Sequence, residues 1–127
     1  MAYVTIIAML ALIEYQIFGI QVGAARSRGK VEAPAVTGDP AFERTFRAHQ
    51  NTLEQLIIFL PALYGAAVFV GELYAVGAGV VFLVGRAIYF RAYSKDAAKR
   101  GPGMMVTMLG NVALLLGALI GALLSVF

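Results

Sequence analysis

The chain alternates long apolar stretches with short polar or glycine-containing segments. The apolar stretches are residues 2–23, 56–70, 73–93 and 104–127. A helix that crosses a bilayer needs about 20 mostly apolar residues. The second apolar stretch is shorter than this, but more polar helical turns precede it and extend the helix. The pattern therefore predicts four transmembrane helices. We expect them at about residues 2–25, 40–71, 73–100 and 103–126.

The segments between these stretches carry residues that end or begin helices. Residues 27–40 contain two glycines and two prolines and predict a loop. Asp39 followed by Pro40 is a typical helix start, because aspartate caps the first turn and proline fits its first position. Gly71 leaves room only for a tight turn, and a further break falls at residues 101–103.

Composition supports a membrane protein. Of the 127 residues, 61% are hydrophobic and 13% are charged, and the mean hydropathy is +0.82, well outside the range of ordinary soluble domains. This length accommodates one domain, residues 1–127, without a separate soluble catalytic unit. The chain lacks cysteine, which excludes disulfides, thiolate metal sites and a cysteine nucleophile. A cleaved signal peptide fits the first stretch poorly, because no basic residue precedes it and Glu14 interrupts it.

The charged residues indicate how the helices are oriented. All ten lysines and arginines lie in two blocks, residues 26–47 and 86–100. Since consecutive helices alternate in direction, both blocks reach the same membrane face, which the positive-inside rule assigns to the cytosol. The net charge of +3 therefore reflects topology, and we expect no nucleic-acid partner. We expect a multi-pass protein of a bacterial inner membrane or the endoplasmic reticulum, in contact with membrane lipids.

Two groups of polar residues stand out near that face. Their members recur at helical spacing, so each group lines one side of a helix. The first group is Glu43, Arg47, Asn51 and Glu54, and the second, if the third helix continues to residue 100, is Tyr89, Tyr93, Asp96 and Arg100. Arginine binds carboxylates, glutamate holds an ammonium group, and an amide pairs with a peptide group. The two groups predict a small, zwitterionic, peptide-like ligand. The other basic residues nearby are interpreted as solvated: Arg44, Arg91, Lys95 and Lys99.

The same residues resemble a known family signature. The run from Phe42 to Glu54 resembles the Arg-Ala-x-x-Asn-x-x-Glu motif, with its flank, of the MAPEG family, the membrane-associated proteins of eicosanoid and glutathione metabolism. A second resemblance covers Gly85 to Tyr93 with Lys99-Arg100, and a third covers Gln21 to Arg26. Together they extend over residues 21–103 and lie nearest the microsomal glutathione transferase and leukotriene C synthase branches.

The resemblance implies a glutathione transferase that assembles as a homotrimer and conjugates glutathione, its co-substrate, to hydrophobic electrophiles from the bilayer, without a metal. Detoxification or eicosanoid metabolism would be its setting, and glutathione-dependent peroxidase activity is a further expectation. In the family, glutathione lies between neighbouring subunits near the cytosolic face. The glutathione-binding residues that the resemblance implies are Arg26, Arg47, His49, Asn51, Glu54, Tyr89, Tyr93 and Arg100, with His49 in place of a family glutamine.

Arg100 is the residue that we expect to be catalytic. It corresponds to the family's arginine beside the glutathione sulfur, where a fixed positive charge favours the reactive thiolate over the thiol. The chain also departs from the leukotriene C synthase pattern. Gln55 stands where that branch has a tyrosine, and Ser27 separates Arg26 from Arg28 where that branch has two consecutive arginines. The resemblance therefore favours a broad glutathione transferase over eicosanoid epoxide chemistry.

Two other functions remain open from the sequence. One is a non-enzymatic lipid-binding scaffold of the same family, although that branch lacks the glutathione residues that this chain retains. The other is a small four-helix multidrug/proton antiporter, in which Glu14 would carry protons. A hydrogen-bonded carboxyl inside the bundle or at a subunit interface is the simpler explanation of Glu14. His49 predicts no metal site, because the chain has no second histidine and no cysteine.

Overall fold

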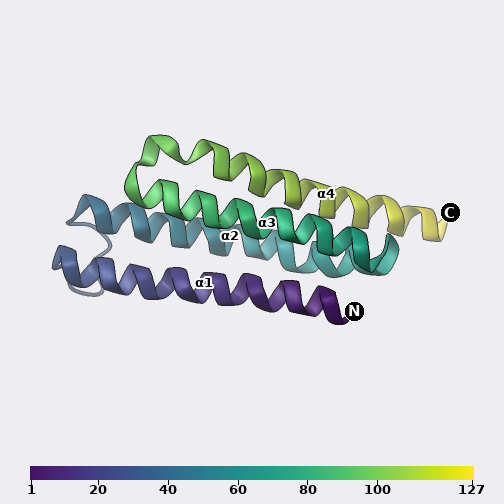
Figure 1. Cartoon of the computed structure of the whole chain (residues 1–127), viewed down its shortest axis with the longest axis horizontal. Coiled ribbons are helices and arrows are strands. Elements are labelled where there is room, and N and C mark those ends of the chain that lie inside the picture. Colours follow the sequence, from purple (N-terminus) through teal and green to yellow (C-terminus); the bar gives the residue numbers. More distant parts are fainter.

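The protein is a bundle of four long helices that run alternately up and down (Figure 1). The computed structural model describes all residues, 1–127. The helices are α1 (Ala2–Gly29), α2 (Pro40–Phe69), α3 (Glu72–Lys95) and α4 (Gly101–Val126), and one short 3₁₀ turn, η1 (Ala97–Lys99), precedes α4. All four are long and apolar enough to cross a membrane. The prediction of an all-α membrane protein built as a four-helix bundle is confirmed.

The two basic segments lie at one end of the bundle. Figure 1 shows the end of α1 and the start of α2 beside the end of α3 and the start of α4, while both chain termini and the α2–α3 turn lie at the opposite end. The end of the bundle that carries residues 26–47 and 86–100 is called the basic end below. The prediction that residues 26–47 and 86–100 reach the same face is therefore confirmed, and its assignment to the cytosol stays a prediction.

The helix ends follow the local chemistry of the sequence. Asp39 accepts a hydrogen bond from the Phe42 amide at 2.9 Å, and Pro40 occupies the first helical position of α2. The turn after α2 contains Gly71 at φ 140°, a conformation that glycine adopts without strain. Glu72 then forms an ion pair with the amino group of Met1, with 2.7 Å between Oε1 and the nitrogen, and this contact joins the turn to the start of α1. Helix α1 continues to Gly29, four residues beyond its expected end.

The junction between α3 and α4 differs from the prediction. We expected the third helix to continue to residue 100, but α3 ends at Lys95 because Asp96 adopts extended backbone. The Asp96 carboxylate accepts a hydrogen bond from the Ala98 amide at 3.0 Å and so begins η1. Helix α4 then begins at Gly101, two residues before its expected start. Arg100 therefore precedes α4 and does not belong to the α3 face that carries Tyr89 and Tyr93.

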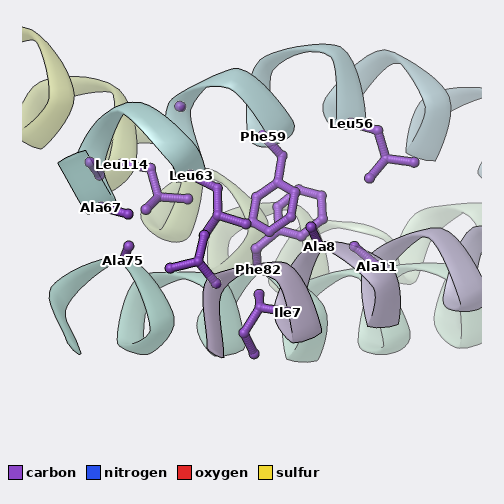
Figure 2. Packing of buried hydrophobic residues seen from close by; sticks show 13 residues of the cluster. Ile7, Ala8, Ala11, Leu56, Phe59, Leu63, Ala67, Ala75, Phe82 and Leu114 are labelled. Carbon is purple, nitrogen blue, oxygen red and sulfur yellow. The ribbon is translucent and has the colours of Figure 1, made fainter. Parts of the chain in front are cut away.

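The bundle core lies in the apolar half of the helices. The rings of Phe59 and Phe82 stack at 3.8 Å between centroids, and Figure 2 shows Leu63 and Ile7 beside them. Small residues such as Ala8, together with further alanines of α1, α2 and α3, complete the buried cluster. Many large apolar side chains of all four helices point outward instead. An outer apolar surface of this kind suits a protein whose solvent is lipid.

Helices α3 and α4 approach each other closely through glycine. A Cβ atom added to Gly103 would fall 2.8 Å from Cβ of Tyr89 and closer still to that residue's backbone. One added to Gly85 would meet Thr107 in the same way. Small residues at helix contacts are the usual means by which membrane helices pack, since lipid supplies no hydrophobic force between them. This contact fixes the start of α4 against the tyrosines of α3.

Candidate functional site

A polar stripe occupies the exposed side of α2 near the basic end. It consists of Arg47, Asn51 and Glu54, and is called the α2 stripe below. Arg47 Nη1 lies 3.9 Å from Glu54 Oε1, with the two side chains 62% and 55% exposed, and Asn51 Nδ2 donates to Glu54 Oε2 at 3.5 Å. The sequence spacing predicted this face, and the structure brings the three side chains together. Since an exposed and loosely formed ion pair contributes little to stability, these charges are available to a ligand.

Tyrosines from α3 and one arginine lie next to the α2 stripe. The rings of Tyr89 and Tyr93 are 5.5 Å apart, Tyr89 being buried and Tyr93 half-buried. The guanidinium carbon of Arg100 lies 5.9 Å from the Tyr93 ring centroid, and Arg100 Nη1 donates to the Ala97 carbonyl at 2.7 Å. The Tyr89 phenol lies within the electrostatic reach of Arg47 and of Arg100. Side chains from α2, α3 and the start of α4 thus converge at the basic end.

Arg100 reaches this group by a route that the sequence spacing did not predict. We expected it to follow Tyr93 on one continuous helix face, together with Asp96. The chain instead leaves α3 at Lys95 and turns back through η1, which carries Arg100 to the Tyr93 ring. Asp96 takes no part, because its carboxylate caps η1. The proximity of Tyr93 and Arg100 is as expected, but its structural reason was wrong.

Arg86 is a residue of this region that the sequence interpretation missed. It is 0% exposed, and its Nη1 donates to Oδ1 of Asn51 at 2.8 Å. Its guanidinium carbon also lies 4.2 Å from the centroid of the Tyr89 ring. Two residues of the candidate site therefore contact one buried cation. An arginine three positions before Tyr89, inside an apolar helix, was the available signal, because such a charge is costly unless it is used.

Arg26 and His49 lie apart from the α2 stripe. Arg26 Nη1 donates to the Ala35 carbonyl at 2.6 Å, and its guanidinium carbon lies 4.5 Å from the Phe42 ring centroid. His49 stacks on Tyr15 of α1 at 4.3 Å between centroids. At 100° per residue, Phe42 and His49 are each about 140–200° around α2 from Arg47. Within one chain, these two candidates lie where α1 packs against α2, away from the α2 stripe.

The remaining basic residues and a polar cavity at the basic end are separate from this group. Arg44, which we interpreted as solvated, donates from Nε to the Ser94 carbonyl at 3.3 Å and so satisfies the end of α3. A cavity of about 490 Å³ opens between α1, α2 and α3 at the basic end. Its lining includes Arg28 and Lys95 but none of the eight expected glutathione-binding residues. The convergent polar face, and not this cavity, is the candidate site.

Known proteins are similar in sequence to this chain over most of its length. The MAPEG family model matches residues 3–120. The chain belongs to the MAPEG family. This MAPEG protein is 43% identical over 117 residues to microsomal glutathione S-transferase 2 of Homo sapiens, covering 92% of this chain and 78% of that protein. It is 36% identical over 94 residues to leukotriene C4 synthase of Bos taurus, covering 74% of this chain and 63% of that protein.

These comparisons confirm the resemblance that the α2 and α3 motifs indicated. Family membership and four apolar helices together identify a multi-pass membrane protein. Relatives of both branches expected from the sequence are found, since the transferase and the synthase each match over about three quarters of this MAPEG protein or more. The individual site residues stay candidates that rest on the resemblance and on their placement at the basic end.

Proposed function

We propose that this MAPEG protein is a membrane-bound glutathione transferase, which joins the thiolate of glutathione to hydrophobic electrophiles. The observation that carries the proposal is the convergence at the basic end of the α2 stripe, the tyrosines of α3 and Arg100 before α4, which direct contacts join through Arg86 and the two tyrosine rings. The relatives whose names state a glutathione S-transferase and a leukotriene C4 synthase support the same activity class.

The α2 stripe suits the charged ends of glutathione. That molecule carries two carboxylates and one ammonium group around two peptide bonds. Arg47 and Glu54 face solvent and form only a 3.9 Å ion pair with each other. A ligand carboxylate at Arg47 and a ligand ammonium at Glu54 can replace this contact. The exchange costs little free energy, because the exposed ion pair contributes little to stability. The Tyr93 phenol and the Asn51 amide would complete the site with hydrogen bonds to the peptide.

Arg100 would activate the thiol. A free cysteine thiol has a pKa of about 8.5, and a guanidinium beside the sulfur lowers that pKa by stabilising the thiolate. The thiol proton passes to solvent, and the sulfur lone pair forms the new bond to carbon while the leaving group departs with its electron pair. Arg100 is exposed at the N-terminus of α4, where the helix dipole adds positive potential. Its guanidinium lies 5.9 Å from the centroid of the Tyr93 ring and donates one hydrogen bond, from Nη1 to the Ala97 carbonyl.

The hydrophobic substrate would reach the sulfur from the lipid side of α4. A shallow cavity of about 440 Å³ begins five residues after Arg100 on this helix. All of its lining residues are apolar: Met105, Val106, Met108, Leu109 and Val112. Methionine adapts to ligands of different shape, which suits a broad range of electrophiles. Hydroperoxides that reach the same place would be reduced to alcohol and water by two glutathione molecules, which leave as the disulfide, and we propose this peroxidase reaction as a side activity.

Assembly as a homotrimer would complete the site. Arg26 and His49 lie on the side of α2 that faces α1, so one chain does not bring them to the α2 stripe. A neighbouring copy that supplies this pair to the next copy's stripe would enclose glutathione between subunits. Co-expression of Arg26→Ala and Arg100→Ala chains tests this arrangement, because mixed trimers regain some intact sites and therefore activity. If co-expression restores no activity, the two residues act within the same chain.

The decisive experiment measures thiolate formation before turnover. Purified protein in detergent is titrated with glutathione while the thiolate difference absorbance is recorded, and conjugation of a generic hydrophobic electrophile is then assayed. We expect a thiolate signal below pH 8 and measurable turnover. A protein that gives neither signal is a non-enzymatic member of the family, and the proposed function is then wrong.

A matched pair of variants tests the role of Arg100. Arg100→Ala should lower turnover at saturating glutathione about 100-fold or more, the size of effect seen when a group that stabilises developing charge is removed. The thiolate signal should shift to higher pH while glutathione binding largely survives. Lys99→Ala, which removes the adjacent exposed charge, is the control and should behave like the wild type. Equal losses of binding and turnover in Arg100→Ala would make Arg100 an anchor for glutathione instead.

A further inference from the structure

Arg86 is the one fully buried charged side chain of the bundle. It is 0% exposed and has the largest side chain among the residues buried to this degree. An arginine inside a membrane protein is costly, and such residues are kept in contact with a cavity, a partner or a site. Arg86 lies on α3 between the bundle core and the candidate site, where it contacts Asn51 and Tyr89. The contact with Asn51 has a chemical consequence for the ligand.

A guanidinium group can only donate hydrogen bonds. The side-chain amide of Asn51 can otherwise present either its oxygen or its NH₂ group in a given direction. Because Arg86 Nη1 donates to Oδ1 at 2.8 Å, the oxygen must face α3 and the NH₂ group must face outward. Asn51 Nδ2 accordingly lies toward Glu54 of the α2 stripe, at 3.5 Å from its Oε2. The buried arginine thus sets which group Asn51 offers to a ligand.

We propose that Arg86 is a positioning residue, which holds Asn51 so that its NH₂ group donates to a carbonyl or carboxylate oxygen of the bound peptide. This inference rests on the proposed function and specifies one contact within it. The α2 stripe then presents donors at Arg47 and Asn51 and an acceptor at Glu54. Arg86 itself does not touch the ligand, because its guanidinium group is enclosed between α2 and α3.

Glu14 of α1 is the acidic side chain that acts on Arg86 through its charge. The two groups form no direct ion pair, however, since the ion pairs of the chain are Met1–Glu72 and Arg47–Glu54. Glu14 Oε1 and Arg86 Nε and Nη2 are all buried without a protein partner. The Glu14 carboxyl therefore forms no hydrogen bond at Oε1 within the chain, in contrast to the hydrogen-bonded carboxyl expected from the sequence.

The test combines single and double variants of Arg86 and Asn51. Arg86→Met keeps the length of the side chain but removes every donor, and it should raise KM for glutathione about tenfold, as expected when one hydrogen bond to the ligand loses its orientation. The turnover number and the pH at which the thiolate signal appears should stay close to wild type, because Arg100 is intact. Asn51→Ala should show a similar KM. The double variant should show no further increase, since both changes remove the same contact.

Two more variants separate positioning from stability. Asn51→Asp can still accept from Arg86 but has no NH₂ group for the ligand, so it should bind glutathione as weakly as Asn51→Ala. Arg86→Met combined with Glu14→Gln removes both buried charges, which keeps the bundle free of an unpaired carboxylate. It should show the KM of Arg86→Met alone. Arg91→Met, on the exposed side of α3, is the matched control and should resemble the wild type.

Several results would overturn this inference. They are a wild-type KM in Arg86→Met, additive losses in the double variant, and wild-type binding by Asn51→Asp. A fall in turnover without a change in KM would equally contradict a positioning role through Asn51. If the wild-type protein binds no glutathione, the proposed function fails and this inference fails with it. Wild-type binding with an unaffected Arg86→Met variant overturns this inference alone.

Discussion

Replacement of Gly103 by alanine should impair turnover far more than it impairs folding. The new Cβ would lie 2.8 Å from Cβ of Tyr89 and closer still to the backbone nitrogen of that residue, whereas carbon atoms pack best at about 3.5–4.0 Å, so the start of α4 must move from α3 by about 1 Å or more. Overpacking of this kind costs about 1–3 kcal/mol, and the better helix propensity of alanine returns up to about 1 kcal/mol. Because the clash is with backbone atoms, which cannot rotate away, the upper end of this range applies and the net loss of stability is about 2 kcal/mol.

The same displacement matters more at Arg100, three residues earlier. A shift of about 1 Å between reacting groups can lower a rate about 100-fold, and Arg100 would move relative to Tyr93 by a similar distance. We therefore expect the turnover number of Gly103→Ala to fall about 10- to 100-fold, while its thermal midpoint in detergent falls by about 5–10 °C and the protein stays folded at the assay temperature.

Gly101→Ala is the control for this prediction. Gly101 lies in the same turn of α4, but a Cβ added there meets nothing within 4 Å. Conjugation rates at saturating glutathione and thermal unfolding are measured for both variants under the same detergent conditions. If Gly103→Ala and Gly101→Ala turn over at the same rate, the close α3–α4 contact does not set the geometry of the site, and the reasoning is refuted.

Three further predictions concern the bundle itself. Phe59→Ala removes one ring of the central stack and should destabilise the protein by about 3–5 kcal/mol, whereas Ile57→Ala on the exposed side should have little effect in the same thermal assay. Tyr74→Phe deletes a 2.6 Å hydrogen bond to a carbonyl of α4 and should lower stability by about 1 kcal/mol; an unchanged midpoint would show that this bond contributes nothing. Arg26→Gln frees the carbonyls at residues 31 and 35 and should speed limited proteolysis there, and equal cleavage of wild type and variant would contradict that role.

The architecture of the bundle could be predicted because its causes are local. Four apolar stretches of sufficient length determine four helices, and the alternation of their direction places both basic blocks at one end. Asp39-Pro40 gave the start of α2 to the residue, since the cap is a contact within one turn. The spacing of Arg47, Asn51 and Glu54 likewise predicted a shared face, because all three belong to one uninterrupted helix.

The end of α3 could not be predicted in the same way. Spacing alone made residues 89–100 look like one continuous helix face, because a run of helix-forming residues leads to the break at residue 101. The structure ends the helix at Lys95 because the Asp96 side chain caps the next turn, a competition that residue spacing does not resolve. Arg100 still approaches Tyr93, because the turn through η1 brings the chain back beside the last turn of α3.

Contacts between helices were the least predictable part of the site. The family resemblance named Arg26 and His49 as binding residues, yet their contacts with the connecting loop and with Tyr15 depend on how α1 packs. Arg86 was missed because the sequence shows a charge inside an apolar helix but does not show that it donates a hydrogen bond to the Asn51 oxygen of another helix. A charged residue inside an apolar helix indicates a site even where the sequence does not show its partner.

Two different kinds of contact hold the two halves of the proposed site. Helices α3 and α4 meet through Gly103, so backbone packing fixes Arg100, the residue proposed to act on the sulfur. Helices α2 and α3 meet near the site through the part-buried hydrogen bond from Arg86 to Asn51, and Asn51 belongs to the proposed binding face. Disturbing the first contact should therefore change the turnover number, and disturbing the second should change KM. If Gly103→Ala and Arg86→Met alter the same parameter to the same extent, the binding and reacting groups respond as one unit, and the division between the two contacts is wrong.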